Sequence, residues 1–225
     1  MITIKNITKD FYSGDLRQNV LKDVNLEIDH GDFLTIMGPS GGGKSTVLHI
    51  MGLLIEPTSG EVYYNNNKIN FKNERSLDNY RRDNIGLIFQ NSNLISCLSP
   101  LENLIIAMNS KESYNSKKKK CKELLDKVGL SKKYNSKVSS LSGGEAQRVA
   151  VVRALVNEPK VILCDEPTGA LDSVNGKNVI ELLLNIRKER NCTLIIVTHD
   201  EKIGELGERK IYLKDGELHE MARNL

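Results

Sequence analysis

The chain of 225 residues is long enough for one α/β domain with an inserted subdomain. Its hydrophobic content of 39% and charged content of 27% are ordinary, and a dispersed net charge of +3 does not indicate a nucleic-acid partner. No apolar run approaches the roughly 18 residues that span a bilayer, and no charged start precedes an apolar core, so we expect another chain to supply any membrane span. The four cysteines lack paired spacing, which suggests neither a zinc site nor a disulfide framework and favours a reducing cytosol.

Two segments near the N-terminus alternate apolar and polar residues. They are residues 2–7 and 24–28, and the alternation predicts half-exposed, antiparallel strands. Between them, Phe11 and Tyr12 form an aromatic pair that enters a turn at Gly14. An exposed aromatic ring can stack on a nucleotide base, but local packing is its commoner role. The pair alone is therefore weak evidence of nucleotide binding.

A glycine-rich loop follows an apolar segment of strand type, 32–37, and precedes a segment typical of a buried helix, 47–54. The loop matches the phosphate-binding pattern G-x-x-x-x-G-K-S, known as the P-loop, and the strand and helix beside it are the context which that pattern requires. Its residues are Gly38, Pro39, Ser40, Gly41, Gly42, Gly43, Lys44, Ser45 and Thr46.

Each residue type in this loop suits a phosphate ligand. Glycines 38, 41, 42 and 43 allow positive φ and a close approach of the ligand, so that backbone N–H groups and the helix start form an anion cradle. Lys44 supplies a mobile charge for the β- and γ-phosphates, and the Ser45 hydroxyl can ligate Mg²⁺. A plain connecting turn is the alternative, but it does not explain Lys-Ser at this offset. The loop therefore predicts binding of a nucleoside triphosphate.

The middle of the chain changes from strand patterns to helix patterns. The expected elements are a turn at 56–60, a strand at 61–64, a short helical stretch near 77–81, a buried strand at 85–89 that ends at Gln90, and helices at 100–108 and 116–129. Gly129 is expected to end the last of these helices. The run Lys117–Lys120 can meet phosphates or lipid headgroups, but a solvated helix face is the simpler interpretation.

The segment Leu141-Ser142-Gly143-Gly144-Glu145 begins another predicted helix. Ser142 and Glu145 have the spacing of a capping box, which predicts a helix through Val156. An ordinary N-cap with flexible glycines would give the same pattern. A Ser-Gly-Gly start would also present free N–H groups to a phosphate, as the P-loop does.

Two continuous apolar segments, 161–164 and 193–197, enclose a helix near 173–189 and predict a β-α-β unit of a parallel sheet. The first strand ends in Asp165, which is placed to hold Mg²⁺, and Glu166, which can accept a proton from an attacking water. Two surface acids are the alternative, but the upstream P-loop argues against it. A P-loop alone fits kinases as well as hydrolases, and the added carboxylate favours hydrolysis.

Near the C-terminus, an Asp-Gly turn predicts a hairpin at 210–218.

At this point the sequence resembles the ATP-binding-cassette (ABC) ATPase family, and the resemblance covers nearly the whole chain. Leu-Ser-Gly-Gly-Glu at 141–145 matches the signature of that family, and it precedes the Walker B carboxylates Asp165 and Glu166. The resemblance implies further roles: Gln90 as the Q-loop contact to Mg²⁺ and water, Asp172 as the D-loop aspartate, His199 as the switch histidine, and Phe11 as the ring that stacks on adenine, with Tyr12 in its place if the register shifts by one.

The resemblance also implies the fold. It is an α/β P-loop NTPase core, with a mostly parallel sheet flanked by helices, an antiparallel β subdomain and an inserted helical subdomain. We expect one ABC ATPase domain over residues 1–225. Residues 1–90 and 156–225 would form the nucleotide-binding core with the β subdomain, and residues 91–155 would form the helical signature subdomain.

Members of this family work as two cassettes arranged head to tail around two ATP molecules. Each ATP is held by the P-loop of one chain and by the signature of the other, here Ser142, Gly143, Gly144 and Glu145. The chain contains one P-loop and one signature, so a second cassette is expected, most simply a second copy. Closure would place Glu166 as general base and His199 against the γ-phosphate, beside Lys44.

Residues 85–103 and 167–172 look most like the macrolide-export and lipoprotein-release group, which also contains the cell-division cassette FtsE and antimicrobial-peptide resistance cassettes. Gly42 departs from the serine most common in the loop of this family. The resemblance implies an ATPase that powers a separate integral membrane permease at the cytoplasmic face of the cell membrane, through a groove near Gln90 and residues 91–155. The substrate stays open.

The alternative is a soluble ABC ATPase without a transporter partner, acting in force transmission, cell division or on nucleic acid. Repair ATPases of that kind carry long coiled coils, and translation factors carry two cassettes in one chain; the sequence has neither feature. A P-loop kinase or switch GTPase would leave the signature and His199 unexplained. We therefore expect no nucleic-acid partner.

Overall fold

A computed structural model describes residues 1–220 and contains two sheets. The larger has six strands in the order β10-β9-β3-β8-β7-β6, and all its neighbours are parallel except the β9–β10 pair. These strands are β3 (Phe33–Met37), β6 (Ile85–Ile88), β7 (Val161–Asp165), β8 (Thr193–Val197), β9 (Arg209–Lys214) and β10 (Glu217–Glu220). Every residue of β3 and β8 is buried, as expected for parallel strands covered on both faces. The predicted α/β fold is confirmed.

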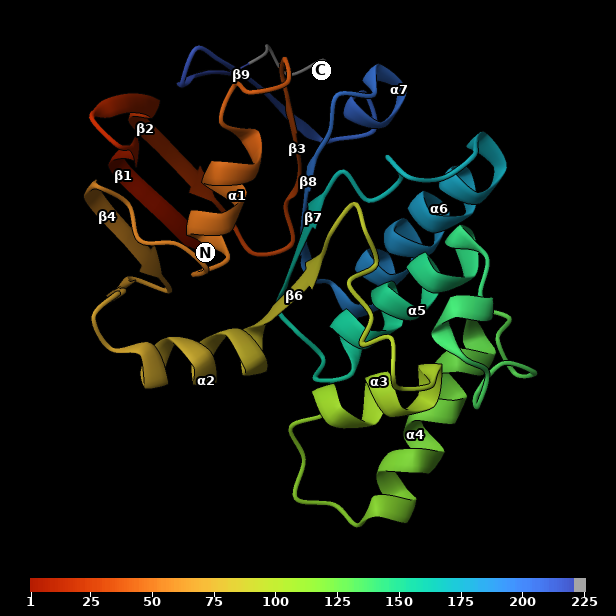
Figure 1. The fold of residues 1–225 in the computed structure, drawn as a ribbon. Helices are drawn as coiled ribbons and strands as arrows, with labels where there is room; N and C mark the ends of the chain where they lie inside the picture. Colours follow the sequence, from red (N-terminus) through yellow and green to blue (C-terminus); the bar gives the residue numbers. More distant parts are fainter. Residues whose placement is uncertain (221–225) are drawn as a thin grey trace.

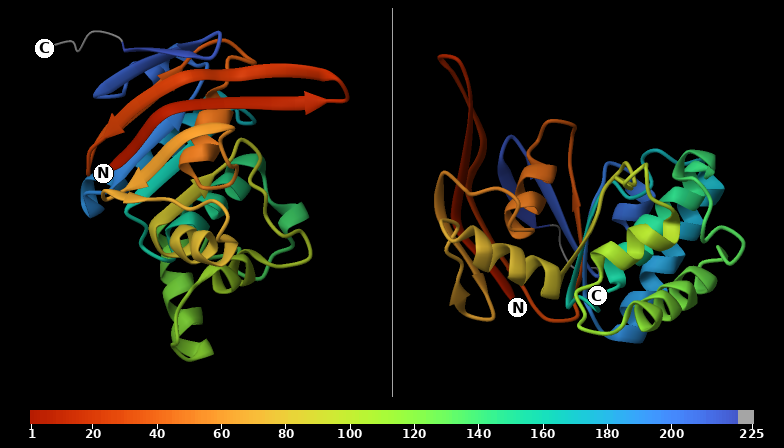
Figure 2. Two further views of the ribbon diagram at one scale, coloured as in Figure 1. Left: turned by 90° about the vertical axis from the view of Figure 1, so that its left-hand side faces the viewer. Right: turned by 60° about the horizontal axis from the view of Figure 1, so that its bottom comes forward.

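The smaller sheet is antiparallel, in the order β2-β1-β4-β5. Its strands are β1 (Ile2–Ser13), β2 (Leu16–Ile28), β4 (Ser59–Tyr64) and β5 (Asn67–Lys68). Both β1 and β2 are longer than their alternating segments indicated, and Figure 2 shows their hairpin reaching past β4. Phe11 and Tyr12 therefore lie in a strand, not in a loop. The preceding residue, Asp10, is buried and accepts hydrogen bonds from Arg17 and Asn19 of β2, which helps to hold this end of the hairpin together.

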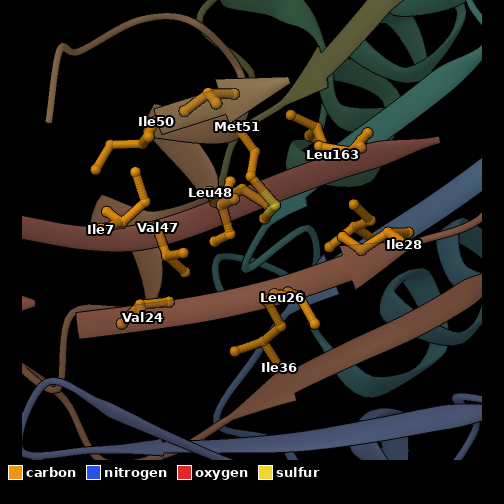
Figure 3. Packing of buried hydrophobic residues seen from close by; sticks show 14 of the residues in the cluster. Ile7, Val24, Leu26, Ile28, Ile36, Val47, Leu48, Ile50, Met51 and Leu163 are labelled. Carbon is orange, nitrogen blue, oxygen red and sulfur yellow. The ribbon is translucent and has the colours of Figure 1, made fainter. Parts of the chain in front are cut away.

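Helix α1 (Lys44–Met51) lies between the two sheets. Its Val47, Leu48 and Met51 pack against residues of both sheets, among them Ile7 and Leu163 (Figure 3). Burial of each such side chain contributes on the order of 1.5–3 kcal/mol relative to exposure. The helix that follows the glycine loop is thus fixed from both sides.

The other face of the parallel sheet is covered by α5 (Gly143–Leu155) and α6 (Ser173–Arg190), as Figure 1 shows. Helices α3 (Pro100–Ala107) and α4 (Tyr114–Lys127) pack with α5 around a third cluster that includes Leu104, Cys121 and Val149. This separate core supports a helical subdomain, although the boundaries at residues 91 and 155 stay a prediction. None of the helices in residues 1–220 has the length and apolar character needed to cross a membrane.

Several elements differ from expectation. Helix α2 (Glu74–Asn84) is twice as long as predicted, because the Asn73 side chain caps it and Leu77 is its one buried residue, which gives little apolar periodicity. The four-residue α7 (Glu201–Gly204), capped by Asp200, and the 3₁₀ turn Val138–Ser140 were not predicted. Gly129 does end α4, at a φ of 73°.

Candidate functional site

The glycine loop joins the carboxyl end of β3 to the start of α1. Gly38, Gly41 and Gly43 have positive φ values of 146°, 79° and 97°, where a side chain would be strained. A Cβ on Gly38 would lie 2.0 Å from the Leu213 carbonyl oxygen, so this position has no room for one. The predicted positive φ is wrong for Gly42, because its φ is not positive. A Cβ there would still lie 3.1 Å from two carbonyl oxygens.

Lys44 is the first residue of α1, and its side chain folds back over the loop. The ammonium donates to the Pro39 carbonyl oxygen at 3.0 Å, and the residue is 7% exposed. The N-cap Gly43 supplies no side-chain cap, so the first N–H groups of the helix remain available to an anion. A pocket of about 300 Å³ opens over Pro39, Ser40, Gly41 and Gly42, and strand β2 and the β9–β10 turn form its other walls.

The Ser45 hydroxyl donates to Oδ1 of Asp165 at 2.9 Å, which brings the end of the P-loop and the end of β7 together. Burial raises the pKa of Asp165, and the hydrogen bond from Ser45 opposes that shift. Nε2 of His49, one helical turn after Ser45, lies 3.5 Å from Oδ2 of Asp165. A hydroxyl beside a carboxylate is the oxygen donor set that Mg²⁺ prefers, so these residues fit the ion. His49 was not among the residues expected at the site, although its i+4 spacing from Ser45 on a helix would have indicated it.

Glu166 lies beside the strand-end residues of β8, because β7 and β8 are parallel neighbours in register. His199 Nδ1 is 2.7 Å from Glu166 Oε1, and the Thr198 hydroxyl donates to Oε2 at 3.2 Å. Glu166 has a φ of 48°, in the left-handed region that non-glycine residues seldom occupy, and its N–H donates to the Val197 carbonyl oxygen. The carboxylate is thus aimed by its backbone and held by two neighbours.

Gln90 follows β6, the strand beside β7, so it lies at the same carboxyl edge of the sheet. Its side chain is exposed and rests on Gly169, in the loop after Glu166. A Cβ on Gly169 would come within 2.7 Å of Gln90 Nε2. The glycine therefore leaves the space that the glutamine amide occupies.

The signature residues form the start of α5. Ser142 accepts from the Glu145 N–H at 3.2 Å, and Glu145 accepts from the Ser142 N–H at 2.8 Å, which is the predicted capping box. Asp172 caps α6 by accepting from the N–H groups of Val174 and Asn175. The two helix starts touch, since a Cβ on Gly144 would lie 2.3 Å from Asn175 Oδ1.

The structure does not bring the signature to the P-loop of the same chain. Helices α1 and α5 pack on opposite faces of the six-stranded sheet, and Figure 1 shows their starts far apart. Ser142 and Gly143 are exposed. The P-loop, Asp165, Glu166, Gln90 and His199 thus gather at one sheet edge, whereas the signature and Asp172 gather elsewhere.

Phe11 is 43% exposed and Tyr12 is 68% exposed. Phe11 is paired across the hairpin with Gln18, a residue that lines the pocket over the P-loop. Directly paired residues of antiparallel strands project to the same face, so Phe11 lies on the pocket side. The ammonium of Lys9 lies 5.1 Å from the centre of the Phe11 ring.

Comparisons of this chain with a family model and with individual proteins all point to the same family. Residues 21–169 match the family model described as ABC transporter. The chain is 47% identical to the uncharacterized ABC transporter ATP-binding protein MJ0796 of Methanocaldococcus jannaschii, covering 97% of this chain and 95% of that one. It is 42% identical to the lipoprotein-releasing system ATP-binding protein LolD of Syntrophus aciditrophicus, covering 97% and 98%.

Two further comparisons extend this. The chain is 43% identical to the macrolide export ATP-binding/permease protein MacB of Bdellovibrio bacteriovorus, covering 96% of this chain and 33% of that longer protein. The dimeric structure of MJ0796 in a post-hydrolysis state, bound to ADP and Pi, superposes with a TM-score of 0.93 at 44% identity over the full length of both chains. The chain is therefore an ATP-binding cassette of the ABC transporter family.

Proposed function

We propose that the chain binds ATP with Mg²⁺, pairs with a second copy around two nucleotides, and hydrolyses ATP to drive a separate integral membrane permease. The single observation that carries this is the split site. One chain gathers P-loop, Asp165, Glu166 and His199 at one edge, and exposes its signature on the opposite side of the sheet. Two copies arranged head to tail would complete both sites, and MJ0796, a relative by sequence and fold, forms a dimer.

Each residue then has a role in the reaction. Lys44 exchanges the Pro39 carbonyl for phosphate oxygens, and backbone N–H groups among residues 40–46 hold the remaining charge. Ser45, Gln90 and Asp165 would hold Mg²⁺, which offsets the charge of the phosphates when bound. Phe11 stacks on adenine above the pocket, a position that its pairing with Gln18 supports over Tyr12.

Glu166 acts as the general base. Its backbone φ and its contacts with Thr198 and His199 fix the carboxylate, so it can accept the proton of a water that attacks the γ-phosphorus. His199 lies beside this carboxylate and contacts the γ-phosphate on closure. Ser142, Gly143, Gly144 and Glu145 of one copy face the nucleotide of the other, where the free N–H groups of the α5 start bind phosphate. Asp172 lies beside them and shares that interface.

The permease belongs to the macrolide or antimicrobial-peptide export group or to the lipoprotein-release group, by similarity to MacB and LolD. It places the cassette at the cytoplasmic face of the membrane. A pocket of about 730 Å³ lies between α4, the α3–α4 loop and the end of α5, and no residue of the expected segment around Gln90 lines it. A soluble cassette without a permease is the alternative.

The experiment uses tagged Glu166→Gln protein expressed in its own host. The protein is captured with ATP and Mg²⁺ from detergent-solubilised membranes, and its partners are identified by mass spectrometry. We expect a stoichiometric partner with several membrane spans. The matched control is the Lys44→Ala, Glu166→Gln double variant, which should recover less of that partner if nucleotide drives closure. Recovery of the single variant only in the soluble fraction would contradict the permease assignment.

A further inference from the structure

Two side chains of the signature helix α5 hold the backbone on either side of Gln90. Gln147 is 2% exposed, and its Nε2 donates to the Phe89 carbonyl oxygen at 2.9 Å. Arg153 donates from Nη1 to the Asn93 carbonyl oxygen at 2.6 Å and from Nη2 to the Ser92 carbonyl oxygen at 3.0 Å. We call residues 89–93 the Q-loop segment. Three of its five carbonyls are thus satisfied from one helix, on both sides of the glutamine.

The following residues are fastened to the same helical group. Asn103 of α3 is fully buried and accepts from the Ile95 N–H at 2.8 Å, while its amide donates to the Ser99 carbonyl oxygen at 3.0 Å. Helices α3 and α5 share the third hydrophobic cluster. Because buried polar groups are costly to leave unpaired, these bonds resist separation of residues 95–99 from the helices.

At its inner end the segment reaches the nucleotide site of its own chain. The ring of Phe89 lies 6.0 Å, between centroids, from the ring of His49. His49 Nε2 lies 3.5 Å from Asp165, which accepts the hydrogen bond from Ser45. A continuous path of contacts therefore joins α5 to the hydroxyl and carboxylate that fit Mg²⁺.

We propose that Gln147 and Arg153 are positioning residues that make the Q-loop segment move with the signature helix. When the start of α5 meets the nucleotide of the second copy, the shift of the helix is carried through these three hydrogen bonds to Gln90. The nucleotide held by one chain's signature then sets the position of Gln90 in that chain's own site. This inference rests on the proposed function and names the residues that link its two half-sites.

Two variants test it with little change of shape. Gln147→Glu replaces the amide donor with a carboxylate that cannot donate to the Phe89 carbonyl. Arg153→Lys keeps the charge but loses the planar fork that reaches two carbonyls. The matched control is Arg148→Lys, on the same helix, because Arg148 donates to the Val128 carbonyl at 3.1 Å and not to the Q-loop segment. Thermal unfolding checks that all three variants fold. We call Gln147→Glu and Arg153→Lys the clamp variants; each removes a different contact to the Q-loop segment, so each is a separate test.

A reporter has to lie inside the Q-loop segment. Cys97 is exposed but lies among residues fastened to α3 by Asn103, while Cys121, Cys164 and Cys192 are buried. Asn91 is exposed and belongs to the segment, so a spin label on Asn91→Cys in a Cys97→Ser, Glu166→Gln background reports the segment itself. We expect ATP with Mg²⁺ to change the spectrum in the parent and in the Arg148→Lys control. The change should be lost in both clamp variants, although each still binds ATP and dimerises.

Kinetics supply a second readout. In protein that retains Glu166, the clamp variants should lower kcat by about tenfold or more and leave the Kd of monomer for ATP within about twofold, the pattern of an interaction made only on the way to the transition state. Clamp variants whose label response and kcat match those of the control would overturn the inference. A parent that forms no ATP-dependent dimer would instead contradict the proposed function, so the two failures are distinguishable.

Discussion

The P-loop edge and the signature edge of the molecule use the same device, a helix start with glycines, in opposite states. At the P-loop edge three reactive side chains already have an internal partner: Lys44 has Pro39, Ser45 has Asp165, and Glu166 has His199. At the signature edge Ser142 is engaged only in capping its own helix, and it is exposed to solvent together with Gly143.

This contrast indicates where the binding energy comes from. In the proposed function, ligand binding at the P-loop edge exchanges one set of hydrogen bonds for another inside a fixed frame, since α1 is held between two sheets. Binding at the signature edge adds contacts where few exist, so its contribution depends on a second copy. The first half-site should govern affinity for ATP, and the second should govern association.

The largest expected effect comes from removing the proposed general base at the P-loop edge. Glu166→Gln should lower kcat by about 10²–10⁴-fold, because an amide cannot accept the proton of the attacking water. ATP binding should persist, and the closed dimer should accumulate. Phosphate release and size-exclusion chromatography with ATP measure the two effects. A variant with normal hydrolysis would remove Glu166 as the base.

The next pair separates the two edges. Lys44→Ala should weaken ATP binding about 10–100-fold, the effect of losing a charge-assisted contact. Ser142→Arg should leave that affinity unchanged and abolish the ATP-dependent dimer, since a long cation at the helix start meets the facing copy. Fluorescent-nucleotide titration and light scattering read affinity and association separately. Loss of ATP affinity in Ser142→Arg monomer would contradict the division.

A subtler comparison lies within the signature. Gly144→Ala would place a Cβ 2.3 Å from Asn175 Oδ1, so α5 must shift against α6, with a loss of roughly 1–3 kcal/mol of stability. The Cβ of Gly143→Ala would lie 3.5 Å from the Leu171 side chain and 3.8 Å from the Ala170 carbonyl oxygen, both ordinary contacts, so stability should change by less than about 0.5 kcal/mol. Both should lower hydrolysis, but only Gly144→Ala should lower the melting temperature. Equal melting temperatures would contradict the packing argument.

The smallest effect concerns the hairpin that carries Phe11. Hydrogen bonds from Arg17 and Asn19 lower the pKa of Asp10 below its ordinary value of 3.8. Ionised Asp10 therefore adds stability that is complete above that value and is lost as pH falls through the lowered folded-state pKa. Asp10→Asn should have a lower melting temperature than the wild type at pH 7. The difference between the two melting temperatures should become smaller as the pH approaches 3. A gap independent of pH would show that the charge contributes nothing.

The features that the sequence predicted best are those set by neighbours along the chain. The glycine loop, the capping box at Ser142 and the glycine stop at 129 are local patterns, and the parallel strands follow from continuous apolar runs. Glu166 beside His199 follows from the rule that parallel strands end at one edge.

What the sequence did not predict depends on pairing between distant segments. Gln147 and Arg153 read as ordinary polar residues on a helix, and only the folded chain places them on carbonyls some sixty residues away. The extension of β1 through Phe11 depends on a buried aspartate that local alternation does not reveal. The φ of Gly42 was wrong because the loop pattern fixes residue types but not which glycine turns.

The left-handed backbone of Glu166 has a consequence for how the protein can change. An L-residue in that region is strained by roughly 1–2 kcal/mol, and glycine is not. Glu166→Gly should therefore relax the main chain, but it also removes the proposed proton acceptor together with its contacts to Thr198 and His199. The strain of this backbone is thus offset by side-chain contacts that a glycine cannot make.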